Sequence, residues 1–375
     1  MIYMLSAGEA SGDLHASQLI SALRNRDPQA RFCFLGGDLM AEAAGCAPLI
    51  HYRDMAYMGF VDVVRHLPQV RRNLAAATSL LRRVKPDALI LVDYPSFNLR
   101  LAAEAKKIGI PVFYYISPKA WAWKEWRVKD ISRLCNYVLS ILPFEPEFYA
   151  SHGYDRCLYV GNPSVEEIDS RLAAAPSTDD FRQKNSLPAK PIIAIVPGSR
   201  VSEIRSNLPV MLDAVRPLTQ KYQPVIAAAP GIDPSLYPAD INRVEGQTTD
   251  LMACATAALV TSGTASLEAA LAGVPQIVCY RHSGSRIFYN IMERVLKIPF
   301  VSLPNLIVGR EVVPELLLHK CTPSAVLHAL VNILPDHPGR EEQLNGYAAV
   351  RFCLGTNPAA STAAAKILAE INLNQ

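Results

Sequence analysis

The sequence predicts an α/β protein with two doubly wound parallel sheets that face each other across a cleft. Short apolar runs alternate with longer segments whose apolar residues recur every three or four positions, as in parallel α/β folds. This alternation lapses once and then restarts, and 375 residues exceed what one ordinary core accommodates. Because ligands bind at the carboxyl ends of such strands, we expect the chemistry to lie in the cleft.

The first domain is predicted over residues 1–172. Its strand candidates are the short apolar runs Ile2–Ser6, Arg31–Leu35, Ala88–Val92, Val112–Ile116, Tyr137–Ile141 and Cys157–Val160. Helical spacing of apolar residues falls between them, for example over Leu14–Leu23 and Leu99–Ile108. The polar stretch that follows, residues 173–190, contains Ala and Pro and is predicted to be a linker.

The second domain is predicted over residues 191–345. Strand candidates return there as Ile192–Val196, Val225–Ala229, Ala257–Thr261 and Gln276–Tyr280. From Thr322 onward the patterns are helical, and residues 346–375 are predicted to be C-terminal helices. The sequence leaves open whether the last helix, Ala359–Ile371, returns to the first domain or swaps to a partner.

Composition and charge disfavour several other classes of protein. Lys plus Arg number 37 against 34 for Asp plus Glu, so the net charge of +3 does not indicate a nucleic-acid partner. The 8 cysteines form no Cys-x-x-Cys pair and indicate free thiols in a reducing compartment. No apolar run approaches the ~20 residues of a membrane span, and no secretory leader precedes the first strand. We therefore expect a cytoplasmic protein whose membrane contact is peripheral.

The loop after the first strand candidate carries two glycines, Gly8 and Gly12, with Ser11 between them. Glycines in a strand-to-helix turn let backbone N–H groups approach a ligand, and the helix N-terminus favours an anion. The Gly-x-x-x-Gly spacing is not the dinucleotide fingerprint, which disfavours a dehydrogenase. The alternative is a tight turn in which Ser11 or Asp13 caps the helix.

Three segments of the second domain, each at a strand end, predict one nucleotide site. Backbone donors and a guanidinium suit a diphosphate, hydroxyl groups suit phosphate oxygens, and a carboxylate about one turn into a helix suits ribose hydroxyls. Ordinary βα turns with solvated side chains are the alternative for each segment. The predicted nucleotide-binding residues are Gly198, Ser199, Arg200, Ser262, Gly263, Thr264, Glu268 and Asn305.

Neither a metal nor a cofactor is expected. The chain contains no Asp-x-Asp element, and its histidines show no ligand spacing such as His-Glu-x-x-His. A leaving diphosphate would then be neutralised by helix N-termini and by Arg200.

Asp93 is the predicted general base, because a carboxylate that ends a parallel strand projects into the cleft. A helix cap is the alternative role. Glu9 and Asp13, on the adjoining loop, are the reserve candidates.

Two segments of the first domain indicate contact with lipid or sugar. All three tryptophans lie near one another among cations, and the apolar run Met55–Val64 is followed by several basic residues. Core packing is the alternative for the apolar run. The predicted lipid-contact residues are Met58, Phe60, Arg65, Arg72, Trp121, Trp123, Trp126 and Arg127.

Eight motifs in a fixed order resemble those of the lipid A disaccharide synthase family. They are AGEASGD, MGFVDV, DYPSFN, SPKAWAWKEWRV, LPFE, PGSR, SGTASLE and VSLPNLIVGREVVPE, and they extend from Ala7 to about Glu315. The resemblance implies a GT-B fold, Ser11 on the acceptor side, and Arg200, Glu268 and Asn305 on the UDP side. This chain departs from the family at Ser96, where members often have a second acidic residue. If that residue is the base in other members, Asp93 or another carboxylate must be the base here.

The resemblance further implies an inverting, metal-independent transfer from UDP-2,3-diacylglucosamine to 2,3-diacylglucosamine 1-phosphate. The products would be a β-1,6 disaccharide 1-phosphate and UDP. It also implies peripheral attachment to the anionic inner-membrane surface of a Gram-negative bacterium, and often a homodimer. Two alternatives are an isomerase similar to UDP-N-acetylglucosamine 2-epimerase and a non-catalytic nucleotide-sugar-binding protein; the Trp-rich and apolar segments disfavour the former.

Overall fold

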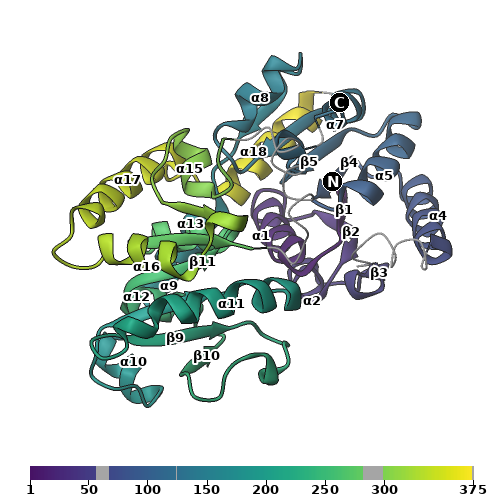
Figure 1. The fold of residues 1–375 in the computed structure, drawn as a ribbon. Coiled ribbons are helices and arrows are strands. Elements are labelled where there is room, and N and C mark those ends of the chain that lie inside the picture. The colour runs from purple at the N-terminus through teal and green to yellow at the C-terminus, as the bar shows by residue number, and fades with distance from the viewer. Residues whose placement is uncertain (56–66, 124, 282–298, 374–375) are drawn as a thin grey trace. The chain divides into compact units, whose positions relative to one another are not determined.

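The computed structural model describes residues 1–55, 67–123, 125–281 and 299–373. The chain divides into two compact units, one formed by residues 1–163 with 356–375 and the other by residues 164–355. Each unit contains one parallel sheet with helices packed against it (Figure 1). The predicted α/β fold class with two doubly wound sheets is confirmed.

The first unit contains a seven-stranded sheet in the order β3-β2-β1-β4-β5-β6-β7, with every neighbouring pair parallel. Its strands are β1 (Ile2–Ala7), β2 (Arg31–Gly36), β3 (Ile50–His51), β4 (Ala88–Val92), β5 (Val112–Tyr115), β6 (Tyr137–Ser140) and β7 (Cys157–Tyr159). Its helices are α1 (Ala10–Arg26), α2 (Asp38–Ala44), α4 (Leu67–Val84), α5 (Pro95–Lys107), α6 (Ala120–Trp123), α7 (Arg127–Leu134), α8 (Glu145–Ser151) and α18 (Ala359–Leu373).

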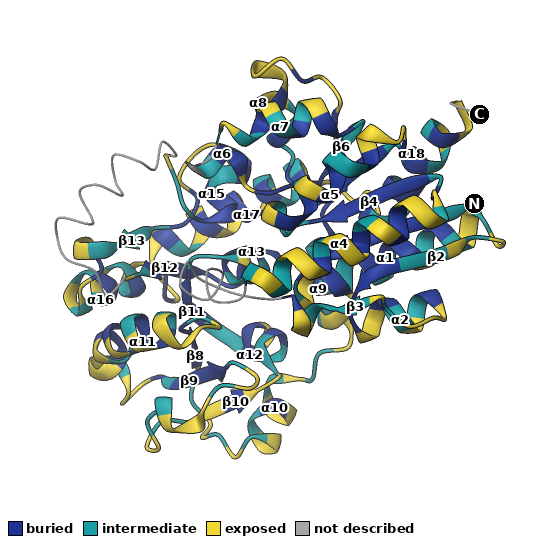
Figure 2. Cartoon of the chain, turned by 90° about the vertical axis from the view of Figure 1, so that its right-hand side faces the viewer, coloured by how far each residue is buried: buried dark blue, intermediate teal, exposed yellow. Residues whose placement is uncertain are grey.

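Helices cover both faces of this sheet, which explains why its central strands are apolar throughout. All five residues of β4 are buried (Figure 2). Successive side chains of a strand point to opposite faces, so Tyr3 and Leu5 join one core cluster and Met4 joins the other. The first cluster includes α1 and α18, and the second includes α4 and α5.

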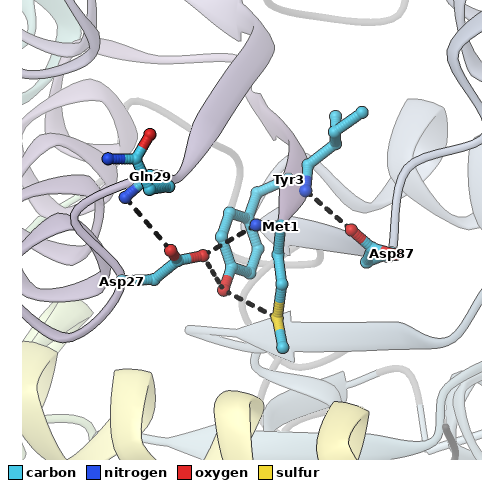
Figure 3. Close-up of polar contacts among 6 residues, drawn as sticks. Met1, Tyr3, Asp27, Gln29 and Asp87 are labelled. Atoms are coloured by element: carbon cyan, nitrogen blue, oxygen red, sulfur yellow. Dashed lines mark hydrogen bonds and ion pairs between the residues drawn. The ribbon is translucent and has the colours of Figure 1, made fainter.

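The N-terminal end of β1 is fixed by two carboxylates (Figure 3). Asp27 accepts hydrogen bonds from the Met1 amine at 2.9 Å and the Tyr3 hydroxyl at 3.5 Å. Asp87 accepts one from the backbone N–H of Ile2 at 2.7 Å. These bonds set the position of the strand that ends in the glycine-containing loop.

The second unit contains a six-stranded parallel sheet in the order β10-β9-β8-β11-β12-β13. Its strands are β8 (Ile192–Val196), β9 (Gln223–Ala228), β10 (Arg243–Glu245), β11 (Ala255–Thr261), β12 (Gln276–Tyr280) and β13 (Glu315–Leu317). The helices are α9 (Pro163–Ala173), which begins at the boundary between the units, α10 (Thr178–Lys184), α11 (Val201–Val215), α12 (Thr248–Cys254), α13 (Thr264–Leu271), α15 (Leu303–Val308), α16 (Pro323–Asn332) and α17 (Pro338–Leu354).

The division of the chain differs from the predicted boundaries in three places. The first unit ends at Pro163 and not at residue 172, so α9 belongs to the second unit. The stretch 173–190, predicted to be a linker, contains helix α10, whose Phe181 is fully buried and anchors it in the second unit. Residues 346–354 belong to α17 in the second unit, where Tyr347 donates a hydrogen bond to the carbonyl of Val274. Helix α18 packs against α1 within the first unit, through Ile367 and its neighbours.

Candidate functional site

In the first unit, the loops after β1 and β4 lie at the topological switch point. Strand order runs outward from β1 to β3 on one side and from β4 to β7 on the other. In open α/β sheets this is where ligands bind, at the carboxyl ends of the strands. The loop after β1 contains Gly8 and Glu9, and the loop after β4 contains Asp93 and Tyr94. The structure therefore brings the predicted base and the glycine-containing loop to neighbouring strand ends.

Asn98 on α5 ties these two strand ends together. It is fully buried, and its side-chain amide donates to the carbonyl oxygens of Ser6 at 3.3 Å and Asp93 at 2.7 Å. Its Oδ1 accepts from the Ser6 hydroxyl at 2.7 Å. The prediction assigned Asn98 no role, because its partner Ser6 on the other strand end lies 92 residues away in the sequence.

The backbone around Asp93 adopts an uncommon conformation. Asp93 and Tyr94 have φ of 44° and 47°, and Ile116, at the end of the neighbouring strand, has φ of 59°. Non-glycine residues rarely adopt positive φ, and such conformations cluster at functional sites. Three hydrogen bonds hold Asp93 in place: its N–H donates to Ile116, and its carbonyl accepts from Asn98 and from the Tyr114 hydroxyl.

Burial raises the pKa of the Asp93 carboxyl above its ordinary value. The Tyr94 N–H and the cations Lys119 and Arg127 act in the opposite direction, and burial is the larger effect. A carboxylate with a raised pKa binds a proton more readily, which is what a general base requires.

The two reserve candidates differ in their surroundings. Asp13 is buried, and its carboxylate accepts hydrogen bonds from the backbone N–H groups of Gly37, Leu39 and Met40 at 2.6, 3.1 and 3.2 Å. It therefore caps the N-terminus of α2, a structural role that differs from the predicted one. Glu9 is half-buried and immediately precedes α1.

The glycines of the first loop allow close packing. A Cβ atom at Gly8 would overlap the ring of Tyr94, and one at Gly12 would contact the side chains of Ala7 and Val92. Ser11, between them, is exposed at the start of α1. A larger residue at position 8 would displace Tyr94, which follows the predicted base.

The predicted lipid-contact residues fall into three groups. Trp121 is 8% exposed, and its indole N–H donates to Glu145 at 2.9 Å, so it belongs to the core. Trp126 is 62% exposed, with the Arg127 guanidinium 5.6 Å from its ring centroid. Outside the described residues lie Met58, Phe60, Arg65 and the side chain of Trp123.

Helices α4 and α5 form a cationic surface in the first unit. A groove of about 950 Å³ between them is lined by the side chains of Arg71, Arg82, Arg83 and Arg100, among others. Helix α4 contains no acidic residue, and its Arg72 is also exposed. Of these arginines, Arg71 and Arg72 belong to the segment predicted to contact lipid; the others were not predicted, since the sequence alone did not show that the two helices pack together.

In the second unit, the switch point lies between β8 and β11. The predicted nucleotide-binding segments at Gly198 and Gly263 follow these two strands directly. Asn207 on α11 ties the strand ends together: its amide donates to the Pro197 carbonyl at 3.4 Å and the Thr261 hydroxyl at 3.2 Å. It was not predicted, and it is the counterpart of Asn98 in the first unit.

The turn after β8 already holds an anionic group from the chain itself. The carboxylate of Glu203 accepts hydrogen bonds from the backbone N–H groups of Ser199 at 3.1 Å and Arg200 at 3.3 Å. Gly198 has φ of 118°, and a Cβ there would overlap Glu203. The side chain of Arg200 is 64% exposed and lies 3.5 Å from Glu203. At this turn its guanidinium is therefore the donor most available to a diphosphate.

The turn after β11 contacts the loop that precedes α15. The Ser262 hydroxyl donates to the Val301 carbonyl at 3.1 Å. Gly263, with φ of 151°, leads to the exposed Thr264 at the start of α13. Burial and the nearby Glu167 raise the pKa of Glu268, one turn into that helix, whereas Arg171 lowers it.

Asn305, for which a nucleotide contact is predicted, is bonded within its own segment of the chain. It is fully buried, and its Oδ1 accepts from the N–H groups of Val312 and Val313 at 2.6 and 2.9 Å. Its Nδ2 donates to the Val313 carbonyl and to Glu315 at 2.9 and 2.8 Å. The amide thus holds the segment at Val312 and Val313 against α15.

Within the described part of the chain, no group of three or more His, Cys, Asp or Glu side chains is arranged to hold a metal ion. No helix among these residues is long and apolar enough to cross a membrane.

Two doubly wound sheets, each with glycine-containing loops at its switch point, define a GT-B-type protein. Solved structures of this fold are similar to the chain: a calicheamicin glycosyltransferase, CalG4, has a TM-score of 0.60 at 14% identity and covers 99% of this chain and 98% of its own. A UDP-N-acetylglucosamine 2-epimerase from Listeria monocytogenes, described as putative, has a TM-score of 0.63 at 12% identity and covers 100% and 96%. At these identities the likeness concerns the fold alone.

The chain belongs to the lipid-A-disaccharide synthetase family, whose model matches residues 3–367. A lipid-A-disaccharide synthase from Myxococcus xanthus is 41% identical over 97% of this chain and 96% of its own length. Another from Acidobacterium capsulatum is 37% identical over 94% and 91%. The predicted family is confirmed, the chain is a glycosyltransferase, and the epimerase alternative is disfavoured.

Proposed function

We propose that the protein transfers 2,3-diacylglucosamine from its UDP carrier to the 6-hydroxyl of 2,3-diacylglucosamine 1-phosphate. The products are the β-1,6-linked disaccharide 1-phosphate and UDP. The family match over residues 3–367 carries this proposal, together with relatives named lipid-A-disaccharide synthase. The loops at the two switch points support it: one carries the carboxylate of Asp93, and the other carries the exposed guanidinium of Arg200, a group that suits a diphosphate.

In this proposal Asp93 accepts the proton of the 6-hydroxyl as that oxygen attacks the anomeric carbon, and inversion follows from attack opposite the leaving UDP. The diphosphate that departs is stabilised by the guanidinium of Arg200 and by the N-terminus of α13 at Thr264. Glu268 accepts hydrogen bonds from the ribose hydroxyls. Ser11 lies on the acceptor side, where its hydroxyl contacts the incoming sugar.

The purified protein tests the reaction directly. It is incubated with UDP-2,3-diacylglucosamine and 2,3-diacylglucosamine 1-phosphate, and the products are identified by mass spectrometry and by the anomeric coupling constant in NMR. We expect the β-1,6 disaccharide and one UDP for each disaccharide formed. A protein that binds UDP but releases none from the donor with this acceptor would be a binding protein.

Activity should survive chelation, because charge on the leaving diphosphate is offset by protein groups. With EDTA in excess over the divalent ions present, we expect turnover within about twofold of the untreated enzyme. Turnover is measured by UDP release, with added magnesium or manganese as the control. A loss on chelation that either ion restores would contradict the metal-independent mechanism.

We further propose attachment to the anionic cytoplasmic surface of the inner membrane through the cationic surface of α4 and α5. Exposed arginines near such a surface each contribute about 1 kcal/mol. Arg71, Arg72, Arg83 and Arg100 are exposed on these two helices, and Trp126 is exposed in the same unit. A homodimer stays a prediction of the family resemblance.

The double substitution Arg71→Glu/Arg83→Glu should weaken binding to vesicles of anionic phospholipid at least tenfold, because it replaces attraction by repulsion at two positions (about 1 kcal/mol for each charge). Binding is measured by co-sedimentation at low and high salt. The double variant Arg31→Glu/Arg205→Glu, at exposed positions elsewhere, has the same net charge and is the control. Equal losses in both variants would mean that net charge, and not this surface, governs attachment.

A further inference from the structure

Glu145 is a buried carboxyl group that the proposed reaction does not use. It is the first residue of α8 and is 2% exposed. Its Oε1 accepts a hydrogen bond from the indole N–H of Trp121 at 2.9 Å. Its Oε2 accepts from the hydroxyl of Ser117 at 3.3 Å and also from that of Ser140. One carboxyl thus joins the ends of β5 and β6 to helix α6.

Hydrogen bonds, and not an ion pair, satisfy this carboxyl among the described residues. A buried carboxylate without a paired cation is costly, which favours the protonated form. Burial raises the pKa of Glu145 to about 7, and the bonds from Ser140, Trp121 and Ser117, together with the positive charge of Lys119, only partly oppose it.

The hydrogen bonds of Ser140 are consistent with a protonated carboxyl. The Ser140 oxygen accepts from the Leu142 N–H at 2.9 Å and also contacts the Leu142 carbonyl at 3.0 Å and Glu145. A hydroxyl has one proton and two lone pairs. If Glu145 is protonated and donates a hydrogen bond to the Ser140 oxygen, the Ser140 hydroxyl can donate its own hydrogen to the Leu142 carbonyl. Each of the three contacts of the Ser140 oxygen then contains one hydrogen.

The segment that Glu145 holds adjoins the predicted base. Residues 117–121 extend from the connection after β5 into α6, and both ends of this segment, Ser117 and Trp121, bond to Glu145. Lys119 lies between them, and its charge lowers the pKa of Asp93. Trp121 also packs edge-on against Phe144, with ring centroids 5.1 Å apart and an interplanar angle of 82°.

We propose that Glu145 is a positioning residue for the transfer: through Trp121 and Ser117 it fixes the 117–121 segment, and with it Lys119, beside the reacting groups. This inference rests on the proposed function for the role of Asp93. Glu145 itself contacts no substrate. Its effect should therefore be on turnover and on acceptor KM, and not on UDP affinity.

Three variants test this role. Glu145→Ala removes the acceptor of the indole N–H, Glu145→Gln keeps a neutral acceptor of the same shape, and Trp121→Phe removes the N–H itself. We expect kcat to fall about tenfold or more in Glu145→Ala and Trp121→Phe, and to stay within about threefold in Glu145→Gln. UDP affinity by calorimetry should be unchanged in all three. Glu147→Ala, an exposed residue of the same helix, is the matched control.

The double variant Glu145→Ala/Trp121→Phe measures whether the two residues act together. We expect it to lose no more activity than the worse single variant, because both substitutions break the same bond. Additive losses would overturn the proposal, as would kinetics like those of the wild type in a folded Glu145→Ala protein. If Glu145→Ala does not fold, normal kinetics in Trp121→Phe overturn it equally.

A spectroscopic measurement separates this inference from the proposed function. Trp123→Phe/Trp126→Phe leaves Trp121 as the sole tryptophan, and its fluorescence should change between pH 6 and 8 (about one unit either side of the carboxyl's pKa). Glu145→Gln should abolish that change. Lys119, Tyr149 and Cys157 also face this carboxyl, and burial raises the pKa of Tyr149 and Cys157 further from neutrality. A change that persists in Glu145→Gln would overturn the inference; an absence of disaccharide product from the unmodified chain would instead refute the proposed function.

Discussion

Asp93→Asn should lower turnover by about 10² or more while leaving UDP binding little changed, in line with the usual contribution of a general base. The 6-hydroxyl of a sugar is a poor nucleophile at neutral pH, so its proton must leave as the new bond forms. Asparagine keeps the shape of the side chain and loses the proton acceptor. Turnover is measured with both substrates saturating, and UDP affinity by calorimetry.

The pH dependence of turnover gives this prediction a second readout. A base works in its deprotonated form, so activity falls as the pH drops through its pKa. An ordinary aspartate has a pKa of about 4. Because burial raises the pKa of Asp93, turnover should fall on acidification at a higher pH than an ordinary aspartate would give. Ser96→Ala, at an exposed position, is the control and should be close to the unmodified enzyme. A loss below tenfold in Asp93→Asn would move the role to Glu9, since Asp13 is bound to three backbone N–H groups.

The central strands were predictable because they are buried on both faces. β4 and β8 are five-residue apolar runs that lie in the middle of their sheets. β3, β10 and β13, of two or three residues, were not predicted, because each contains only one or two apolar residues. β7 is equally short, but it was predicted because the run Cys157–Val160 is apolar throughout. All four lie at sheet edges and form only where a neighbouring strand offers hydrogen bonds.

The site was predictable where local sequence determines it. Gly198 and Gly263 stand directly after central strands, and the structure places both at a switch point. Asn98, Asn207 and Glu145 were not predicted because each bonds a residue from a distant part of the chain, namely Ser6, Thr261 and Trp121 respectively. For the same reason the pattern around Trp121 indicated a surface, although a partner 24 residues away places the indole in the core.

Arg200→Ala should weaken UDP affinity by about 1.5–3 kcal/mol, the usual contribution of a charge-assisted contact. That corresponds to roughly 10- to 150-fold in Kd. The two backbone N–H groups at this turn are already bonded to Glu203, so the guanidinium is the donor that a diphosphate can most readily engage. The ion pair between Arg200 and Glu203, at 3.5 Å, is exposed to solvent and therefore weak. Breaking it to bind a diphosphate requires little free energy.

Calorimetric titration with UDP measures this effect, and Arg205→Ala is the matched control. Arg205 is exposed on the same helix, more than one turn from the strand end, and should leave UDP affinity unchanged. If both variants lose affinity equally, the effect comes from the general positive charge of α11. If Arg200→Ala alone binds UDP as tightly as the unmodified chain, the diphosphate does not lie at this turn. The turn after β11, with Ser262 and Thr264, would then be its remaining binding site at the switch point of the second sheet.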